Sequence, residues 1–338
     1  MYSNQILISD TSLRDGNHAV AHQISKTQIE EYCIDADKAG VAIIEVGHGN
    51  GLGASSIQVG LAKISDTLML ETARKNIVKG KLGIHVIPGF ATIKRDLINA
   101  LKIGVDVVRV ASHCTEADIT QRHLEFVRES GKEAIGVLMM SHLATPQVLL
   151  EEAQKMELYG AEGIIIMDSA GAYLPFEVKE RIQILVNSLN IPVGFHAHNN
   201  LGMAIANSIA AIESGAKILD ASIRGFGAGA GNAQLEVLVA VLEKMNIITG
   251  INLYKILDAA DNAEKKLIPK IPTINSNSIV SGLAGVFSGF SKHVDRISAE
   301  FNVDPRDVYY ALGKRKVVGG QEDLIYEVAL EISIKNKK

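Results

Sequence analysis

Short runs of aliphatic and β-branched residues alternate along the chain with longer stretches in which apolar residues recur at helical spacing. The apolar runs cover residues 5–9, 42–46, 82–87, 105–111, 134–139, 163–167, 192–195 and 218–223. Several are nearly continuous in valine and isoleucine, which is typical of parallel strands covered by helices on both faces. The pattern therefore predicts a set of buried, parallel strands.

Helical periodicity fills most of the intervals between the predicted strands. The predicted helices cover residues 26–39, 92–103, 118–130, 146–159, 176–189, 204–214 and 234–245. Eight βα units in roughly 245 residues match the usual size of a (β/α)8 barrel, and a doubly wound open sheet is the alternative. The positions of the polar residues distinguish these two folds.

Polar residues stand at the carboxyl ends of most of the predicted strands. They are Asp10 and Asp15, Glu45 and His48, Ser112 and His113, Ser141 and His142, Asp168 and Ser169, His196 and His198, and Arg224. A barrel collects such residues on one face, whereas an open sheet concentrates them at one switch point. We therefore expect an α/β protein with a (β/α)8 TIM barrel.

Beyond the barrel, a predicted helix at residues 253–266 is followed by two prolines and small polar residues within 268–278. We predict a catalytic barrel of residues 1–262 and a small helical C-terminal domain of residues 263–338. In this tail, Asp304 and Pro305 begin a helix that Gly313 is expected to end, and residues 322–334 form the last helix. So short a tail is marginal as an independent core, so it should pack on the barrel or on a partner.

Composition limits the classes of function. The chain has 338 residues, 47% of them hydrophobic, and a net charge of −4. A negative net charge does not favour binding to nucleic acid, and no apolar run is long enough to span a membrane. Small-molecule substrates are therefore expected. Cys33 and Cys114 lie in unrelated segments, and residues 1–10 lack the basic region and long apolar segment that are typical of a secretory leader. We expect a cytoplasmic protein.

The stretch 9–23, SDTSLRDGNHAVAHQ, places two acids, one arginine and two histidines after an apolar run. Buried charges need partners, so we interpret this stretch as half of an active site, with 196–198, HAH, as the other half. His196 and His198 are two residues apart on a strand and should face the same side. With one carboxylate they suit Mn, Co, Fe or Mg; structural histidines and a non-haem iron oxygenase are the alternatives.

Other residues in these segments have two interpretations each. Arg14 suits stabilisation of an enolate beside a metal, or forms a simple salt bridge with Asp10 or Asp15. His18 and His22 share a face if a helical turn forms, and either could be a general base; HAVAH lacks the glutamate of a zinc protease. The hydroxyl of Ser169 could bind a substrate carboxylate or cap a helix. The glycine-rich segment 225–232 favours packing at the barrel rim over anion binding.

Seven segments together resemble the 4-hydroxy-2-oxovalerate aldolases, metal-dependent class II pyruvate aldolases of the HMG-CoA-lyase-like superfamily. They are the stretch 9–23, 45–52 (EVGHGNGL), 109–118 (RVASHCTEAD), 138–142 (LMMSH), 196–202 (HAHNNLG), 227–237 (GAGAGNAQLEV) and 317–325 (VVGGQEDLI). The resemblance implies a barrel whose helical C-terminal domain docks an acylating acetaldehyde dehydrogenase, in a heterotetramer that channels the aldehyde during aromatic hydrocarbon catabolism.

The resemblance also implies a reaction and roles for residues. A 4-hydroxy-2-oxo acid such as 4-hydroxy-2-oxopentanoate would be cleaved to pyruvate and acetaldehyde. Asp15, His196 and His198 would bind Mn²⁺, with Co²⁺ or Mg²⁺ possible; Arg14 would stabilise the pyruvate enolate and His18 would be the base. His196 and Arg14 would also contact substrate, together with Ser169 and the residue at position 287.

The chain departs from the family pattern at two positions. Phe287 stands in VFSGF where the family usually has VYSSF, so the tyrosine hydroxyl is missing and control at C4 or substrate preference is expected to shift. Asn199 replaces a histidine after the ligand pair. The alternatives are a Claisen-type enzyme that condenses an acyl-CoA with a 2-oxo acid, and a non-catalytic partner subunit of the dehydrogenase.

Overall fold

The computed structural model describes residues 5–337, in which eight parallel strands close into a barrel in sequence order. The strands are β1 (Leu7–Leu13), β2 (Ile43–Val46), β3 (Lys81–Val86), β4 (Val107–His113), β5 (Glu133–Met139), β6 (Gly163–Asp168), β7 (Val193–Ala197) and β8 (Ile218–Ala221). Leu7 of β1 is in register with Ile218 of β8, which closes the barrel. The predicted (β/α)8 fold is confirmed.

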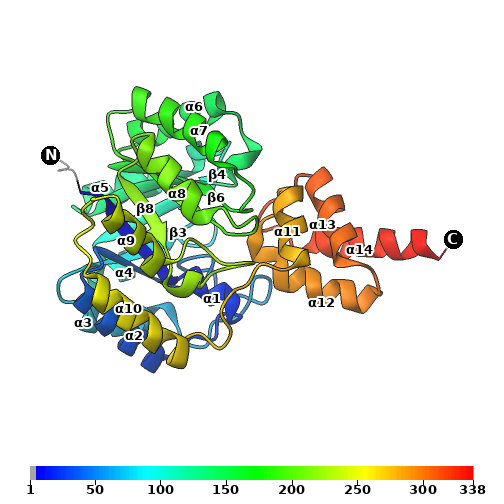
Figure 1. Ribbon diagram of the computed structural model, residues 1–338, viewed down its shortest axis with the longest axis horizontal. Coiled ribbons are helices and arrows are strands. Elements are labelled where there is room, and N and C mark those ends of the chain that lie inside the picture. The colour runs from blue at the N-terminus through cyan, green and yellow to red at the C-terminus, as the bar shows by residue number, and fades with distance from the viewer. Residues whose placement is uncertain (1–4, 338) are drawn as a thin grey trace.

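Helices surround this barrel (Figure 1). They are α1 (Gly16–Ala19), α2 (Lys26–Ala39), α3 (Asp66–Asn76), α4 (Ile98–Ile103), α5 (Gln121–Glu129), α6 (Pro146–Leu158), α7 (Pro175–Ser188), α8 (Ala204–Glu213), α9 (Leu235–Lys244) and α10 (Leu253–Lys266). The sequence pattern missed α3, which buries Met69, Leu70 and Ala73 on a largely polar helix. The helix predicted at 92–103 begins instead with a π-helical segment, Ile93–Leu97.

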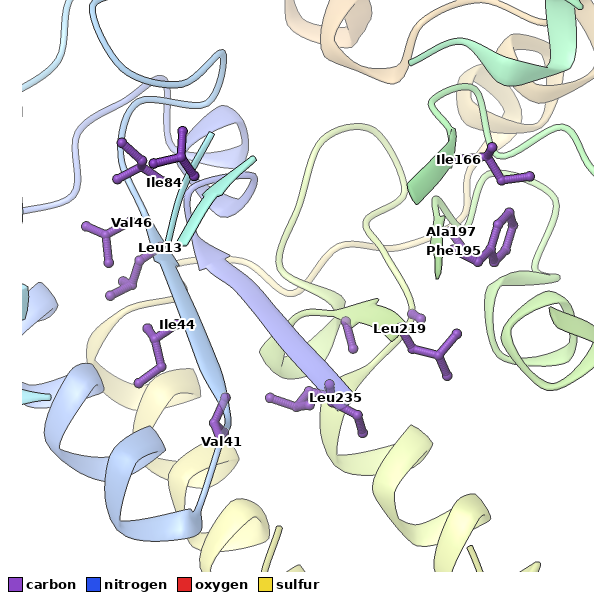
Figure 2. Close-up of a cluster of buried hydrophobic side chains, with 14 of the residues drawn as sticks. Leu13, Val41, Ile44, Val46, Ile84, Ile166, Phe195, Ala197, Leu219 and Leu235 are labelled. Carbon is purple, nitrogen blue, oxygen red and sulfur yellow. The ribbon is translucent and has the colours of Figure 1, made fainter. Parts of the chain in front are cut away.

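Two apolar layers hold the barrel together. The main core lies between strands and helices, where Leu13, Ile44 and Leu219 from the strands lie in one cluster with Leu235 of α9 (Figure 2). A smaller cluster fills the barrel interior. Successive strand residues point to opposite faces, so continuously apolar strands serve both layers.

The C-terminal tail has its own apolar core and lies to one side of the barrel in Figure 1. Its helices are α11 (Ser276–Ala284), α12 (Ser291–Phe301), α13 (Pro305–Lys314) and α14 (Asp323–Asn336). The predicted division after residue 262 falls within α10, a helix that packs against α2 of the barrel. The division into two domains therefore stays a prediction.

The prediction that Gly313 ends a helix was wrong. Helix α13 begins at Pro305 with Asp304 as its cap, as predicted, but it continues through Gly313 to Lys314. A β-carbon on Gly313 would lie 2.2 Å from the carbonyl oxygen of Ala284. The glycine is therefore needed where α13 approaches the end of α11, a contact between helices that local sequence does not show.

The tail is fastened to the mouth of the barrel by hydrogen bonds on either side of residue 287. The Ser288 amide donates to the carbonyl of Ser169 at 2.9 Å, and the ring of His142 donates from Nε2 to the carbonyl of Gly285 at 2.9 Å. Lys292 donates to the carbonyl of Ala19 at 2.6 Å. Within residues 5–337, no helix is both long and apolar enough to cross a membrane.

Candidate metal centre and active site

Asp15 follows the end of β1 and is held at the barrel mouth by several donors. Its Oδ1 accepts a hydrogen bond from Nη1 of Arg14 at 2.8 Å, and its Oδ2 accepts from Nδ2 of Asn232 at 2.8 Å and from the amide of Ala228 at 3.2 Å. Burial alone would raise the pKa of Asp15, but Arg14 and the nearby histidines hold that pKa well below its usual value. Asp15 is therefore an oriented carboxylate.

The glycine-rich segment 225–232 packs at the rim, as predicted. A β-carbon on Gly227 would lie 2.6 Å from Oδ2 of Asp15, so only glycine allows the loop to approach the carboxylate this closely. Asn232 in the same loop donates to that oxygen. The loop therefore positions Asp15, a role that the sequence did not reveal.

His196 and His198 lie at the end of β7 with their Nε2 atoms 3.4 Å apart, which confirms that they face the same side. Nδ1 of His196 is 2.9 Å from Oδ2 of Asp220, on β8. A carboxylate can only accept here, so Nδ1 carries the hydrogen and Nε2 keeps its lone pair. Nε2 of His196 therefore has no hydrogen to donate to Nε2 of His198, and its lone pair is available to a metal ion.

These residues fit a divalent cation. One ligand atom from each of Asp15, His196 and His198 lies within 4.8 Å of the others, and all three residues are buried. Two imidazoles and one carboxylate facing a common point, with a carboxylate behind one imidazole, form a donor set that binds divalent ions and leaves open positions. The geometry thus assembles a candidate metal centre from both halves of the sequence.

Arg14 is fixed on one side and free on the other. Its Nε donates to Oε1 of Glu45 at 2.5 Å and its Nη1 to Asp15, whereas its Nη2 is buried without a hydrogen-bond partner among the described residues. Arg14 therefore forms the predicted salt bridge with Asp15, not with Asp10, and it retains a donor beside the candidate metal centre, while its role at an enolate stays a prediction. Such a held donor is suited to stabilise a developing oxyanion.

A cavity of about 230 Å³ opens beside Arg14 and Asp15. The rest of its wall is largely apolar, and part of it comes from Phe287 and residues 318–320 of the tail. The lining includes His18, His85, Ile87, Phe90, Ile119, Met139, Met167, His198, Phe287, Val318 and Gly319. A second cavity, of about 360 Å³, shares His18 and Phe287 with the first. These two side chains therefore lie at the border of the two cavities.

His18 lies on α1, and its ring centroid is 5.2 Å from that of His22. Burial lowers the pKa of His18 to about 4, despite the opposing effect of Asp15, so its imidazole is neutral at pH 7 and can accept a proton. His22 instead stacks on His48 with centroids 3.6 Å apart and accepts from the amide of Gly49 at 3.3 Å. His18, and not His22, lines the cavity beside the metal centre.

Unfolding is expected to become easier as the pH falls below about 6.5. Burial lowers the pKa of His22 to about 2 and that of His48 to about 4, from 6.5. The unfolded chain therefore takes up protons that the folded chain does not, and the stability from these groups, complete above pH 6.5, is lost as the pH falls toward 4. The urea midpoint should be lower at pH 5 than at pH 7.5.

The matched variant for this pH dependence is His48→Gln. Glutamine does not titrate, so the variant should show a smaller loss of stability between the two pH values. An equal loss in the variant and the wild type would contradict the assignment to His48.

Several of the predicted polar residues do not line the cavity, among them Asp10, Arg224 and Ser169. Asp10 is inside β1, not at its end, and accepts from the Tyr32 hydroxyl of α2 at 2.6 Å. Arg224 pairs with Glu236, Asp261 and Glu264 on the outer helices. Both were expected at the mouth because the pattern does not define where β1 and β8 end. The Ser169 hydroxyl accepts from the amide of Met140 at 3.0 Å, and Ser169 is not among the described residues that line the cavity.

The sequence also left several site residues without a role. They are His85, Arg109, Asp220 and Asn232. Each of the first three is a polar residue flanked on both sides by apolar residues within a strand, and this is the signal that could have identified them. Burial of an isolated polar group is costly, so a lone charge within a buried strand indicates a partner elsewhere in the barrel.

Residues 5–262 match the family model HMGL-like, and residues 272–334 match the DmpG-like communication domain. The fold and the site thus define an HMGL-like barrel with a candidate metal centre. A 4-hydroxy-2-oxovalerate aldolase of Spirochaeta aurantia is 63% identical over 98% of both chains, and one of Pectobacterium atrosepticum is 61% identical over 99% of this chain and 98% of that one. The chain belongs to the family of 4-hydroxy-2-oxovalerate aldolases.

Two solved structures show the same fold at low identity. The N-terminal domain of a putative aldolase from Bacteroides vulgatus superposes with a TM-score of 0.73 at 23% identity, over 88% of this chain and 98% of that one. The carboxyl transferase domain of Rhizobium etli pyruvate carboxylase gives a TM-score of 0.82 at 16% identity, over 99% of this chain and 61% of that one. Both likenesses concern the fold alone.

Proposed function

We propose that this chain cleaves 4-hydroxy-2-oxopentanoate to pyruvate and acetaldehyde, with a divalent cation held by Asp15, His196 and His198. The observation that carries the proposal is one cavity lined by Asp15 and His198 of this triad, by Arg14 with its unpartnered Nη2 and by the neutral imidazole of His18, with His196 grouped behind them. The relatives named as aldolases match the whole chain, so the acyl-CoA condensing alternative is not favoured.

The chain's own residues account for the proton and charge movements of a retro-aldol cleavage. His18 takes the proton of the 4-hydroxyl, the C3–C4 bond breaks, and the aldehyde leaves with its new carbonyl. The electron pair moves to the 2-oxo oxygen, where Nη2 of Arg14 donates to the enolate oxygen. The protonated His18 can then return the proton to C3 and give pyruvate. A divalent cation supplies Lewis-acid polarisation of the 2-oxo group when bound.

Mn²⁺ is the proposed ion, with Co²⁺ and Mg²⁺ as alternatives that the same donors accept. The test is pyruvate release by metal-depleted protein after addition of Mn²⁺, Co²⁺, Mg²⁺ or Zn²⁺, with 4-hydroxy-2-oxo acids of increasing length. Release should depend on added metal and be fastest with 4-hydroxy-2-oxopentanoate. Absence of release with every combination would overturn the proposal.

The tail supports a proposal about partners. Residues 272–334 match a communication domain, and the second cavity lies between this tail and the barrel. The proposed partner is an acylating acetaldehyde dehydrogenase in a heterotetramer, which receives the aldehyde without its release to solvent. The two free, buried cysteines support a cytoplasmic location.

Phe287→Tyr is expected to change the enantiomer ratio of aldol products by about fivefold, because one neutral hydrogen bond contributes about 1 kcal/mol. The Phe287 ring lines the cavity with its centroid 6.4 Å from that of His18, so a hydroxyl there adds a donor near the substrate's 4-oxygen. Chiral chromatography of products from pyruvate and acetaldehyde gives the ratio. Phe301→Tyr, in α12, is the control, and identical ratios in all three proteins would contradict the prediction.

A further inference from the structure

Arg109 is a fully buried arginine in the middle of the barrel. It belongs to β4, is 1% exposed, and points into the interior below the cavity, where its guanidinium meets two carboxylates. Nη1 forms an ion pair with Oε2 of Glu45 at 2.8 Å, without hydrogen-bond geometry, and Nη2 donates a hydrogen bond to Oδ2 of Asp220. A buried charge of this kind costs several kcal/mol unless it is paired, so these two contacts define its place.

The two carboxylates each reach a different part of the active site. Glu45 uses its other oxygen to accept from Nε of Arg14 at 2.5 Å. Asp220 accepts from Nδ1 of His196 at 2.9 Å with the same oxygen that Arg109 contacts. A continuous series of buried contacts therefore connects Arg14, the proposed oxyanion donor, to His196, the proposed ligand, with Arg109 at its centre.

The topology explains why one long side chain is needed for this link. Strands β4 and β8 lie opposite each other in the closed barrel, so Arg109 spans the interior to reach Asp220. Arginine combines this length with a planar fork that can hold two carboxylates in fixed directions, whereas lysine offers a single point charge. Burial alone would raise the pKa of Glu45, but Arg109 and then Arg14 lower it to about 2, which keeps the bridge ionised.

We propose that Arg109 is a positioning residue that fixes Arg14 and His196 relative to each other, through Glu45 and Asp220. This inference rests on the proposed function. By keeping Asp220 in place as an acceptor, Arg109 maintains the His196 tautomer whose Nε2 lone pair faces the metal centre. By keeping Glu45 in place, it orients the guanidinium of Arg14 so that Nη2 remains directed toward the reacting oxygen.

Arg109→Lys tests the proposal with two independent measurements. Titration of the metal-free protein with Mn²⁺ should show a dissociation constant about 10- to 100-fold higher than in the wild type, as is usual when a carboxylate behind a ligating histidine is disturbed. At saturating Mn²⁺, kcat for pyruvate release should also fall, by about tenfold or more, because Arg14 is no longer oriented.

Arg181→Lys is the matched control. Arg181 is another buried arginine, but it stacks over the ring of Tyr173 at 4.7 Å and donates to the carbonyls of Glu177 and Ala144. Its replacement should lower the melting temperature without changing Mn²⁺ affinity. Equal changes in Mn²⁺ affinity for the two lysine variants would show that Arg109 acts only through stability and would overturn the proposal.

Two further variants test separately the contacts through Asp220 to His196 and those through Glu45 to Arg14. Asp220→Asn should weaken Mn²⁺ binding, whereas Glu45→Gln should lower kcat at saturating Mn²⁺ and leave the affinity unchanged. If the Arg109→Lys protein does not fold, the double variant Glu45→Gln with Asp220→Asn provides the test. If Arg109 couples Glu45 to Asp220, the effects of the two substitutions on kcat/KM are not additive. Additive effects would refute the coupling. A wild type that binds Mn²⁺ but releases no pyruvate would refute the proposed function, while the order of Mn²⁺ affinities would still test Arg109.

Discussion

Replacing His198 with alanine is expected to abolish tight Mn²⁺ binding and to lower kcat/KM for pyruvate release by about a thousandfold, on the order of 4 kcal/mol. His198 supplies one of the three ligand atoms of the candidate centre. Its Nδ1 has no hydrogen-bond partner among residues 5–337, so the replacement breaks few protein contacts and should leave the fold intact. Titration with Mn²⁺ and a coupled pyruvate assay measure the two effects.

His123→Ala provides the comparison for this prediction. His123 is on α5, and it too has a buried Nδ1 without a partner, while its Nε2 bonds the carbonyl of Ala91 at 3.1 Å. It lies outside the cavity beside the metal centre. Unchanged Mn²⁺ affinity in His198→Ala, or an equal loss in both variants, would rule out the proposed ligand set.

His18→Ala is expected to lower kcat by a factor on the order of a thousand, within the usual range for removal of a general base, while Mn²⁺ affinity stays within a few-fold of the wild type. The imidazole is neutral in the folded protein because burial lowers its pKa to about 4. It lines the cavity that contains Arg14 and Asp15 but is not one of the grouped ligand atoms. Loss of the base should therefore separate catalysis from metal binding.

The suitable control is His293→Ala, because His293 lines only the second cavity. This variant should retain the wild-type kcat for pyruvate release in the absence of the dehydrogenase. A kcat for His18→Ala that is close to the wild-type value would exclude His18 as the base. Partial recovery of His18→Ala by added imidazole would support the proton-transfer role directly.

Prediction from the sequence worked best where the evidence is local. The helix at residues 26–39 coincides with α2, because a serine cap, a helical period and a terminal glycine lie within one short segment. The motif around Arg14, Asp15 and His18 was identified in the same way, from charges that follow an apolar run. Helix α3 was missed because its buried face is small, so its period is weak.

The sequence by itself determined the eight-stranded barrel and the two segments that carry the candidate ligands and the candidate base. It did so because strand and helix periods, and the spacing of two histidines on one strand, depend only on neighbouring residues. Tertiary structure alone decided which polar residues meet. Whether a residue near a strand end faces the mouth depends on where the strand ends and how it is tilted, and this excluded Asp10 and Arg224 from the cavity.

Tertiary structure alone also decided the ion pairs that Arg109 forms with Glu45 and Asp220. Arg109 and Asp220 are 111 residues apart and come from opposite strands of the barrel, so no local pattern relates them. Closure of the barrel brings them into contact, and exclusion of water makes each charge depend on the other. The sequence supplied the groups for the chemistry, and the closed barrel arranged them into one site.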